Sequence, residues 1–346
     1  MNAGNELMAD AVFEGGGAKG IAYAGALEIF EQAGYQWKNL AGASAGAITA
    51  ALLAVGYPAK EIRKILEERI DYQRFRDAKG IGNIPYVGPY LNLLIKKGMY
   101  KGDYFLDMMR TLLREGMAKY HPDKKIDGEV TFGDLIVDKE PDDSMEDYED
   151  RYKYRLQVVV SDISTNRMVI LPRESKERFG VEPEELEVAL SVRMSGSFPF
   201  VFEPVPFKDA NNRKHLLVDG GMLSNFPISL FDSPGEQVTA WPTFGFLLWE
   251  PGSERPYKRI SWIGSMAMAL IKTMTAAHDR KAIEEITNSR ILKIPTGKYT
   301  TTDFDLDRKD VEWLCDSGEK AAERFLKTWD FDQHKEERKK LTALGS

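Results

Sequence analysis

The stretch VFEGGGAKGIAYAGAL, residues 12–27, sets three consecutive glycines between an apolar run and a segment with the pattern of a helix. Glycine loses more conformational freedom on folding than any other residue, so three in a row indicate that the bare backbone is needed there. Such a backbone can hold a phosphate, make a tight turn, or stabilise a negative charge that forms during a reaction. The rest of the chain decides among these uses.

The segments on either side alternate between strand and helix patterns. Short apolar runs predict strands, and apolar residues spaced by three or four predict helices. Strands interleaved with helices indicate a three-layer α/β/α fold with a mostly parallel central sheet. Helices are predicted at 19–34, 47–56 and 58–70, and strands at 10–13, within 37–46, and at 155–160, 167–171, 215–218, 244–249 and 290–294.

A second glycine motif, GASAG at 42–46, places Ser44 in the pattern G-x-S-x-G. Between a strand and a helix this spacing predicts a sharp turn that holds the serine exposed, and Gly42 and Gly46 avoid the clashes that a Cβ would cause in the bend. Ser44 would then lie at a helix N-terminus, where unpaired N–H groups and the helix dipole favour negative charge. The motif predicts a nucleophile. The alternative is a small-residue turn that packs a helix tightly on a strand.

The first glycine motif, EGGGAKG at 14–20, formally fits the dinucleotide-binding pattern G-x-G-x-x-G. A dinucleotide site also needs an acidic residue about 20 positions further on, and the corresponding stretch NLAGASAG has none. The motif also lacks the spacing and the Lys-Ser/Thr pair of a Walker loop. We therefore predict that the amides of Gly15, Gly16 and Gly17 form an oxyanion hole facing the serine, where one such donor contributes about 3 to 4 kcal/mol to transition-state stabilisation.

A serine nucleophile needs a base, and the chain has four histidines. A conventional hydrolase triad would use His278 or His334, but neither has a glycine-rich or strand-end context, and the polar stretch around His334 predicts exposure. In HLLVDGGMLSNFP (215–227), by contrast, an apolar strand leads to Asp219 at a Gly-Gly turn. We expect a parallel strand whose carboxyl end brings Asp219 to Ser44 as the base. A plain Asp-Gly turn is the alternative.

Composition excludes several classes of function. The net charge of −7 argues against nucleic-acid binding and gives no attraction to anionic membranes. The single cysteine, Cys315, leaves no internal disulfide and too few thiolates for a Cys-based metal site. No segment has the pattern of a signal peptide or the length of a spanning helix. We expect a soluble, cytoplasmic protein whose membrane contact would be peripheral and apolar.

Four blocks in chain order resemble the patatin-like phospholipases, serine acyl hydrolases that use a Ser–Asp dyad. GGGAKG is similar to the family's oxyanion block, GASAG to its nucleophile elbow and DGG to its catalytic-Asp block. VRMSGSFPFVFEP (192–204) is similar to the Ser-x-x-x-Pro block through Ser195 and Pro199. The likeness covers about residues 10–230. Lys19 stands where the family often has Arg, so the bidentate geometry of Arg is lost and Lys19 is given no catalytic role.

The resemblance implies hydrolysis of fatty-acyl esters of phospholipids or lysophospholipids. It implies a covalent acyl-Ser44 intermediate, Asp219 as the base, the three amides of Gly15 to Gly17 as oxyanion hole, and no metal or other cofactor. An acyltransferase with the same dyad and a non-enzymatic nucleotide or lipid binder are the alternatives. Head group, acyl position, chain length and oligomeric state stay open.

The organisation of the chain predicts one domain, 1–330, without a clean interdomain linker. An acidic loop or insertion is expected at about 138–153, and a charged, frayed tail at 331–346. The aromatic and Pro/Gly-rich segment 81–102 and the apolar segment 259–274 are candidates for lipid contact, and packing on the core is the alternative for each.

The stretch TDFDLDRKDVEWL (302–314) begins like a calcium-binding loop. Its sixth position, however, is Arg308 where glycine is needed, and its twelfth is Leu314 where glutamate is needed. The stretch instead predicts a polar turn in which Asp307 caps the following helix.

Overall fold

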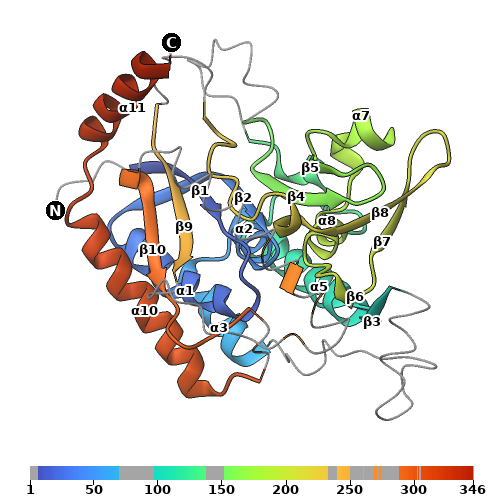
Figure 1. The fold of residues 1–346 in the computed structure, drawn as a ribbon, viewed down its shortest axis with the longest axis horizontal. Helices are drawn as coiled ribbons and strands as arrows, with labels where there is room; N and C mark the ends of the chain where they lie inside the picture. The colour runs from blue at the N-terminus through green and yellow to red at the C-terminus, as the bar shows by residue number, and fades with distance from the viewer. Residues whose placement is uncertain are drawn as a thin grey trace.

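The fold is built around a central β-sheet flanked by helices (Figure 1). The computed structural model describes residues 7–69, 97–137, 152–232, 240–249, 288–301, 303 and 305–345, with a few single positions between 260 and 273. Within these ranges the strands of the main sheet pair in the sequence β10-β9-β1-β2-β4-β8-β7, with β2 and β8 on different parts of one edge of β4 and β5 on its other edge. Strands β3 and β6 form a separate pair. The strands are β1 Leu7–Phe13, β2 Tyr35–Ala43, β3 Gly98–Tyr100, β4 Leu156–Asp162, β5 Arg167–Leu171, β6 Phe200–Phe202, β7 Val205–Lys208, β8 Lys214–Asp219, β9 Thr243–Trp249 and β10 Ile291–Pro295.

In Figure 1, α10 lies beside β10, α11 lies above it at the upper left, and α5 and α8 lie near β4 and β8. The α-helices are α1 Ala22–Gln32, α2 Ala45–Ala54, α3 Ala59–Lys64, α5 Asp103–Tyr120, α7 Ser175–Phe179, α8 Val188–Ser195, α10 Arg308–Leu326 and α11 Phe331–Gly345. Shorter helical turns are η1 Gly17–Ile21, η2 Ile65–Arg69, η5 Phe132–Leu135, η6 Pro183–Glu185, η7 Gly220–Met222 and η8 Asn288–Arg290. No helix in the described ranges is both long and apolar enough to cross a membrane.

Strand direction changes across the sheet. Strands β10, β9, β1, β2 and β4 run parallel. Strands β5 and β8 run antiparallel to β4, and β7 runs antiparallel to β8. The predicted α/β fold with a mostly parallel sheet is confirmed. The predicted direction of the strand that carries Asp219 is wrong, because β8 is antiparallel.

Alternate side chains of the strands enter two hydrophobic cores, since successive residues of a strand point to opposite faces of the sheet. In the first core, Phe13 packs against Tyr23 of α1 and Phe246 of β9, with ring centroids 5.3 and 4.8 Å apart. In the second core, Val12 is buried with Phe226 from the segment after β8. Helices α1 and α2 close the first core, and α10 packs against α1.

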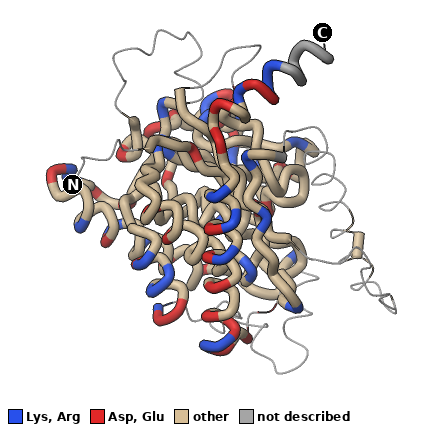
Figure 2. The backbone as a smooth tube through the Cα atoms, turned by 90° about the vertical axis from the view of Figure 1, so that its left-hand side faces the viewer, with Lys and Arg blue, Asp and Glu red and all other residues tan. Residues whose placement is uncertain are grey.

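Charged residues follow the outer helices. Figure 2 shows basic and acidic residues mixed along the helices of one side of the molecule, whereas the interior segments are mostly uncharged. The net charge of −7 is therefore not gathered into one acidic stretch on this side.

Several segments singled out in the sequence are only partly included in the described residues. Residues 138–151 of the predicted acidic loop lie outside the described residues. The same holds for 81–96 and for most of 259–274, the two segments predicted as candidates for lipid contact. Residues 98–100 form β3. The charged segment after residue 330, which was expected to be frayed, forms α11.

Candidate active site

A strained turn joins β2 to α2 at Ser44. Its backbone has φ 51° and ψ −122°, a conformation that residues with a side chain seldom adopt. A Cβ on Gly42 would lie 2.3 Å from the carbonyl carbon of Gly46, and a Cβ on Gly46 would lie 2.3 Å from the carbonyl oxygen of Phe13. The turn therefore requires glycine on both sides, and it leaves Ser44 half-buried at the N-terminus of α2.

A buried serine holds the backbone of this turn. The N–H of Ser44 donates to Oγ of Ser195 at 2.9 Å, and Ser195 Oγ donates to the carbonyl oxygen of Val159 at 2.6 Å. Ser195 is the last residue of α8 and is fully buried. The Ser195 hydroxyl thus links the backbone of the turn to the backbone of β4 through two hydrogen bonds. The Ser-x-x-x-Pro block singled out Ser195 in the sequence, but no spacing indicated this partner 151 residues away.

Strand β8 brings Asp219 to Ser44 from the opposite direction. Strands β2 and β5 both pair with Val158 and Val159 of β4, so they lie on opposite edges of β4. Strands β5 and β8 both pair with residues 160–162, so they too lie on opposite edges. It follows that β2 and β8 share one edge of β4.

The carboxyl ends of β2 and β8 therefore face each other along that edge. Ala43, the last residue of β2, pairs with Val159, and Asp219, the last residue of β8, pairs with Val160. Adjacent residues of a strand are about 3.3 Å apart along it. The antiparallel direction of β8 is what places the carboxylate beside the turn that follows Ala43.

The carboxylate of Asp219 is buried and sparsely hydrogen-bonded. Its side chain accepts the N–H of Gly221 through Oδ1 at 2.8 Å, while Oδ2 makes no hydrogen bond of ordinary geometry within the described structure. Burial raises the pKa of Asp219 to about 6, and interactions with the Ser44 hydroxyl and the Gly221 N–H offset part of that rise. The hydroxyl is thus close enough to lower the carboxyl pKa, without a well-formed hydrogen bond between the two side chains.

The glycine loop lies against the same turn. A Cβ on Gly15 would come within 3.2 Å of Ser44 Cβ. The N–H of Gly15 donates to the carbonyl oxygen of Asn225 at 3.0 Å, so this amide is already engaged. Within the described structure the amides of Gly16 and Gly17 donate to no acceptor. Gly17 has φ +55°, which favours glycine at that position.

Asn225 and Glu14 tie this loop to its surroundings. The side-chain Nδ2 of Asn225 donates to the carbonyl oxygen of Gly15 at 3.0 Å and to Oε1 of Glu14 at 3.1 Å. The other carboxylate oxygen of Glu14 accepts the N–H of Leu248 in β9 at 2.7 Å. Apart from their places beside the GGG and DGG motifs, no sequence pattern indicated a role for either side chain.

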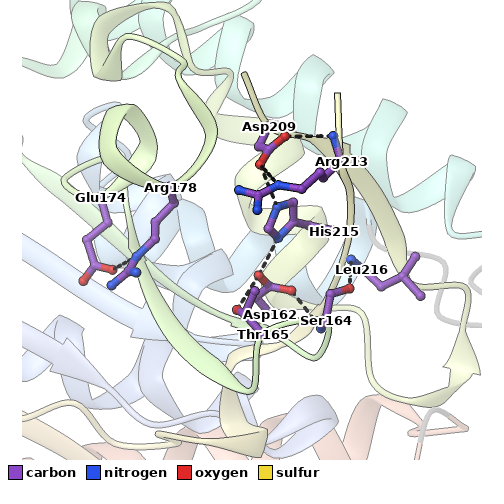
Figure 3. A network of polar contacts seen from close by, with 9 residues as sticks. All are labelled: Asp162, Ser164, Thr165, Glu174, Arg178, Asp209, Arg213, His215 and Leu216. Carbon is purple, nitrogen blue, oxygen red and sulfur yellow. Dashed lines mark hydrogen bonds and ion pairs between the residues drawn. The ribbon is translucent and has the colours of Figure 1, made fainter. Parts of the chain in front are cut away.

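The described histidines lie in other surroundings. His215 contacts Asp162 through Nδ1 at 2.7 Å, and its Nε2 lies 3.6 Å from Asp209 (Figure 3). His334 contacts Ser289 Oγ through Nδ1 at 2.9 Å and is buried, so its predicted exposure is wrong. The ring of His121 lies near Gly56 and has an unpaired, buried Nε2. None of the three has a hydrogen bond with Ser44 or Asp219, and His278 lies outside the described residues.

The described residues contain no group of three or more His, Cys, Asp or Glu side chains that could hold a metal ion. Cys315 is buried, and burial raises the pKa of its thiol to about 12. Within the described residues, the structure therefore brings together a strained serine, a buried carboxylate and a glycine loop in which two amides have no acceptor.

Known proteins are similar to this chain in sequence. A family model described as patatin-like phospholipase matches residues 11–232. The Bacillus subtilis (strain 168) protein YqhO is 36% identical over 326 residues, which cover 93% of this chain and 99% of YqhO. Protein R571 of Acanthamoeba polyphaga mimivirus is 26% identical over 319 residues, which cover 90% of this chain and 91% of R571.

Solved structures agree at the level of the fold. VipD from Legionella pneumophila matches with a TM-score of 0.53 and 19% identity over 95% of this chain and 67% of the VipD chain. ExoU, in the heterodimeric ExoU–SpcU complex from the type III secretion system of Pseudomonas aeruginosa, matches with a TM-score of 0.50 and 18% identity over 93% of this chain and 51% of that chain. The family model spans the glycine loop, the turn at Ser44 and the end of β8. The chain belongs to the patatin-like phospholipase family.

Proposed function

We propose that this chain hydrolyses fatty-acyl esters of phospholipids or lysophospholipids through a covalent acyl-Ser44 intermediate. Membership of the patatin-like phospholipase family supports lipid acyl hydrolysis in general. The observation that carries the more specific proposal is the meeting of the two strand ends, which sets the buried carboxylate of Asp219 beside the hydroxyl of Ser44.

Asp219 acts as the general base. Its Oδ2 takes the proton of the Ser44 hydroxyl as Oγ forms a bond to the ester carbonyl carbon, and the carbonyl π electrons move to oxygen. When the tetrahedral intermediate collapses, the acyl–oxygen bond to the leaving alcohol breaks and Asp219 returns the proton to that alcohol. A water molecule then repeats the sequence on the acyl-serine, which releases the fatty acid and restores the hydroxyl.

The environment of Asp219 suits this role. A carboxyl group in water, with a pKa near 4, is a weak base at neutral pH, whereas burial raises the pKa of Asp219 to about 6. The group is therefore still ionised at pH 7 but holds a proton more readily than an exposed aspartate does. A pKa close to the working pH favours a residue that must both accept and return a proton.

The amides of Gly16 and Gly17 are the proposed oxyanion donors. Gly15 was expected to contribute as well, but its N–H already donates to Asn225, so we assign Gly15 the role of fixing the loop. The N-terminus of α2, directly after Ser44, adds a favourable dipole for the developing negative charge. Such preorganised donors typically contribute about 3 to 4 kcal/mol each to transition-state stabilisation.

A fluorophosphonate probe on the intact protein, followed by peptide mapping, tests the assignment. We expect one adduct, on Ser44, which is absent in Ser44→Ala and strongly reduced in Asp219→Asn. Asp162→Asn is the matched control, because Asp162 is also a buried aspartate at the end of a sheet strand but contacts His215. Labelling that stays undiminished in Asp219→Asn would overturn the dyad.

Product analysis separates the proposed activity from its alternatives. Incubation with a labelled phospholipid should release free fatty acid, and acyl transfer to an added alcohol in preference to water would identify an acyltransferase. Equilibrium dialysis with NAD and ATP tests the nucleotide binder. Tight nucleotide binding in a protein that is inert toward esters would replace the proposal.

A further inference from the structure

We propose that Asn225 is a positioning residue that holds the glycine loop in the shape of an oxyanion hole. The inference rests on the function proposed above and extends it to a residue outside the Ser–Asp pair. Asn225 lies after β8 in the sequence, yet its contacts reach back to the loop that follows β1.

Asn225 holds both backbone polar groups of one glycine. Its carbonyl oxygen accepts the N–H of Gly15 at 3.0 Å, and its side-chain Nδ2 donates to the carbonyl oxygen of Gly15 at 3.0 Å. The carbonyl of Gly15 and the N–H of Gly16 belong to one planar peptide unit and point in opposite directions. Holding the carbonyl therefore fixes the direction of the Gly16 N–H, which is one of the two proposed oxyanion donors.

The orientation of the Asn225 amide is itself fixed. Nδ2 also donates to Oε1 of Glu14, and the other oxygen of Glu14 accepts the N–H of Leu248 in β9. Asn225 and Glu14 are each 7% exposed, so these contacts are largely shielded from water. A buried carboxylate that accepts from Nδ2 excludes the flipped amide, because that orientation would set two acceptors against each other.

The other end of the Asn225 amide lies between the two halves of the site. A Cβ on Gly15 would lie 2.3 Å from Oδ1 of Asn225, and a Cβ on Gly221 would lie 2.6 Å from the same oxygen. Gly221 in turn donates its N–H to Asp219. One side chain thus contacts the glycine loop and the turn that carries the proposed base.

Loss of this side chain should act on the rate of the chemical step more than on substrate binding. Three consecutive glycines have wide conformational freedom, so the loop keeps one shape only if its neighbours impose it. An oxyanion donor displaced by about 1 Å can cost on the order of a hundredfold in rate. For Asn225→Ala we expect kcat to fall about tenfold to a hundredfold with KM nearly unchanged.

Three variants test the role of the Asn225 side chain. Asn225→Ala removes it, and Asn225→Asp keeps its size but sets a carboxylate against Glu14. In the double variant Glu14→Gln with Asn225→Asp, the new amide at position 14 donates to the new carboxylate, but the carbonyl oxygen of Gly15 still lacks its donor, so kcat should stay as low as in Asn225→Ala. Asn39→Ala is the control, because Asn39 is a buried asparagine whose Nδ2 bonds the carbonyls of Tyr152 and Tyr154 in another part of the sheet. It should leave KM and kcat nearly unchanged.

A second readout does not depend on catalysis. Hydrogen–deuterium exchange of peptides covering residues 12–20 should be faster in Asn225→Ala than in wild type, both with Ser44 present and in a Ser44→Ala background. It should be unchanged in Asn39→Ala. Unchanged exchange in Asn225→Ala, or a loss of activity confined to KM, would overturn the proposal.

The two proposals fail in different ways. A wild-type protein that neither reacts with the fluorophosphonate nor cleaves esters would overturn the proposed function, while the exchange experiment would still decide whether Asn225 orders the loop. An active wild type whose Asn225 variants keep both kcat and exchange protection would leave the function standing and overturn the role of Asn225.

Discussion

Ser44 holds backbone strain at the point where the chain leaves β2, and a left-handed conformation of this kind costs on the order of 1 to 3 kcal/mol. The strain persists only if the surroundings impose it. The hydroxyl of Ser195 does part of this, because it accepts the Ser44 N–H and anchors it to the carbonyl of Val159. The strained turn and the end of α8 therefore form one unit.

Replacing Ser195 by alanine should damage both stability and activity. The change leaves the N–H of Ser44 and the carbonyl of Val159 without their partner in a buried place, which costs about 1 to 3 kcal/mol. We expect kcat for ester hydrolysis to fall about tenfold or more, because the proposed nucleophile loses its fixed position. Kinetics with a soluble ester, together with urea unfolding, measure the two effects.

Ser191→Ala is the matched control for this experiment. Ser191 is also a buried serine of α8, but its Oγ donates only to the carbonyl of Glu187, one turn back. It should lose little activity. If Ser191→Ala and Ser195→Ala had equal kcat values, Ser195 would have no special role in holding Ser44.

The raised pKa of Asp219 predicts how activity depends on pH. The proposed base must be ionised to take the serine proton, and burial raises its pKa to about 6. The logarithm of kcat/KM should therefore rise with pH up to about 6 and level off above it. Initial rates between pH 4.5 and 8.5, on a substrate that does not itself ionise in this range, measure the profile.

Asp10→Asn is the control for the pH profile. Asp10 is a second buried aspartate with a raised pKa, about 7, and it lies among Asn39, Trp241 and Thr243. The rise near pH 6 should stay in place when Asp10 is replaced. A profile that is flat down to pH 4.5 in wild type would contradict the assignment of Asp219 as the base.

How far the sequence predicts this site depends on how local each contact is. Ser44 with its flanking glycines, and Asp219 before its Gly-Gly turn, can be singled out as candidates because each motif lies within a few residues. The contacts from Ser195 to Ser44 and from Asn225 to Gly15 span 151 and 210 residues. Serine and asparagine are common in turns, so only the folded arrangement reveals these partners.

At the scale of the elements, an apolar run predicts a strand but does not predict its direction. The prediction that HLLV forms a strand is confirmed, since it lies in β8. The prediction that this strand is parallel to its neighbours is wrong, because β8 runs antiparallel to β4. Direction depends on the connection, and here the chain passes from β4 through β5, α7, α8 and the β6–β7 segment before it returns. Asp219 lies near Ser44 because β8 pairs with the same edge of β4 as β2 does, beyond the end of β2 and in the opposite direction.

The start of α10 allows a prediction at this scale. Asp307 was predicted to cap the helix, and the structure confirms it, since the Asp307 side chain accepts the N–H of Asp310 and the Asp310 side chain accepts the N–H of Asp307. Asp307→Ala should lower the free energy of unfolding by about 1 kcal/mol, because the cap is lost, and leave kcat unchanged, because the Asp307 side chain bonds Asp310 within α10 and not the glycine loop.

Asp316→Ala provides the comparison for the cap. Asp316 is an exposed aspartate in the middle of the same helix, so the change in charge is equal but no cap is lost. Its effect on the free energy of unfolding should stay within about 0.5 kcal/mol. Urea unfolding of both variants decides. Equal destabilisation by the two substitutions would mean that the capping box adds nothing to stability.

At the scale of the whole molecule, charge in the sequence is a poor guide to burial near the C-terminus. The charged run after residue 330 suggested a solvated tail, but it forms α11, and one face of the helix buries His334 against Trp329, with ring centroids 5.4 Å apart. Burial, together with the nearby positive charges of Arg290 and Arg338, lowers the pKa of His334 to about 4. The imidazole is therefore uncharged at neutral pH, which is compatible with a buried position.

Buried carboxyl groups determine how the stability of the whole molecule changes with pH. Burial raises the pKa of Asp10 from 3.8 to about 7, so the folded state holds this proton more tightly than the unfolded state does. The contribution of Asp10 to the free energy of unfolding therefore falls as pH rises from about 4 to 7, and the destabilisation by its buried charge is complete above pH 7.

Asp209 changes stability with pH in the opposite direction. Burial alone would raise its pKa, but hydrogen bonds from Arg213 hold the pKa at about 2, so its stabilising contribution is present at neutral pH and is lost as pH falls toward 2.

Replacing Asp10 or Asp209 by asparagine should change the free energy of unfolding in opposite directions at pH 8. In Asp10→Asn, Oδ1 can still accept from Asn39 and Trp241 while the new NH₂ group donates to Thr243, so the variant keeps the contacts and loses the buried charge. We expect it to be more stable than wild type at pH 8, by on the order of 2 kcal/mol, with the difference vanishing near pH 4. Asp209→Asn should be less stable than wild type at pH 8, with a difference that shrinks only below about pH 4. Urea unfolding of the three proteins from pH 3 to 8 measures these differences. If Asp10→Asn were less stable than wild type at pH 8, the buried carboxylate of Asp10 would be stabilising, contrary to the prediction.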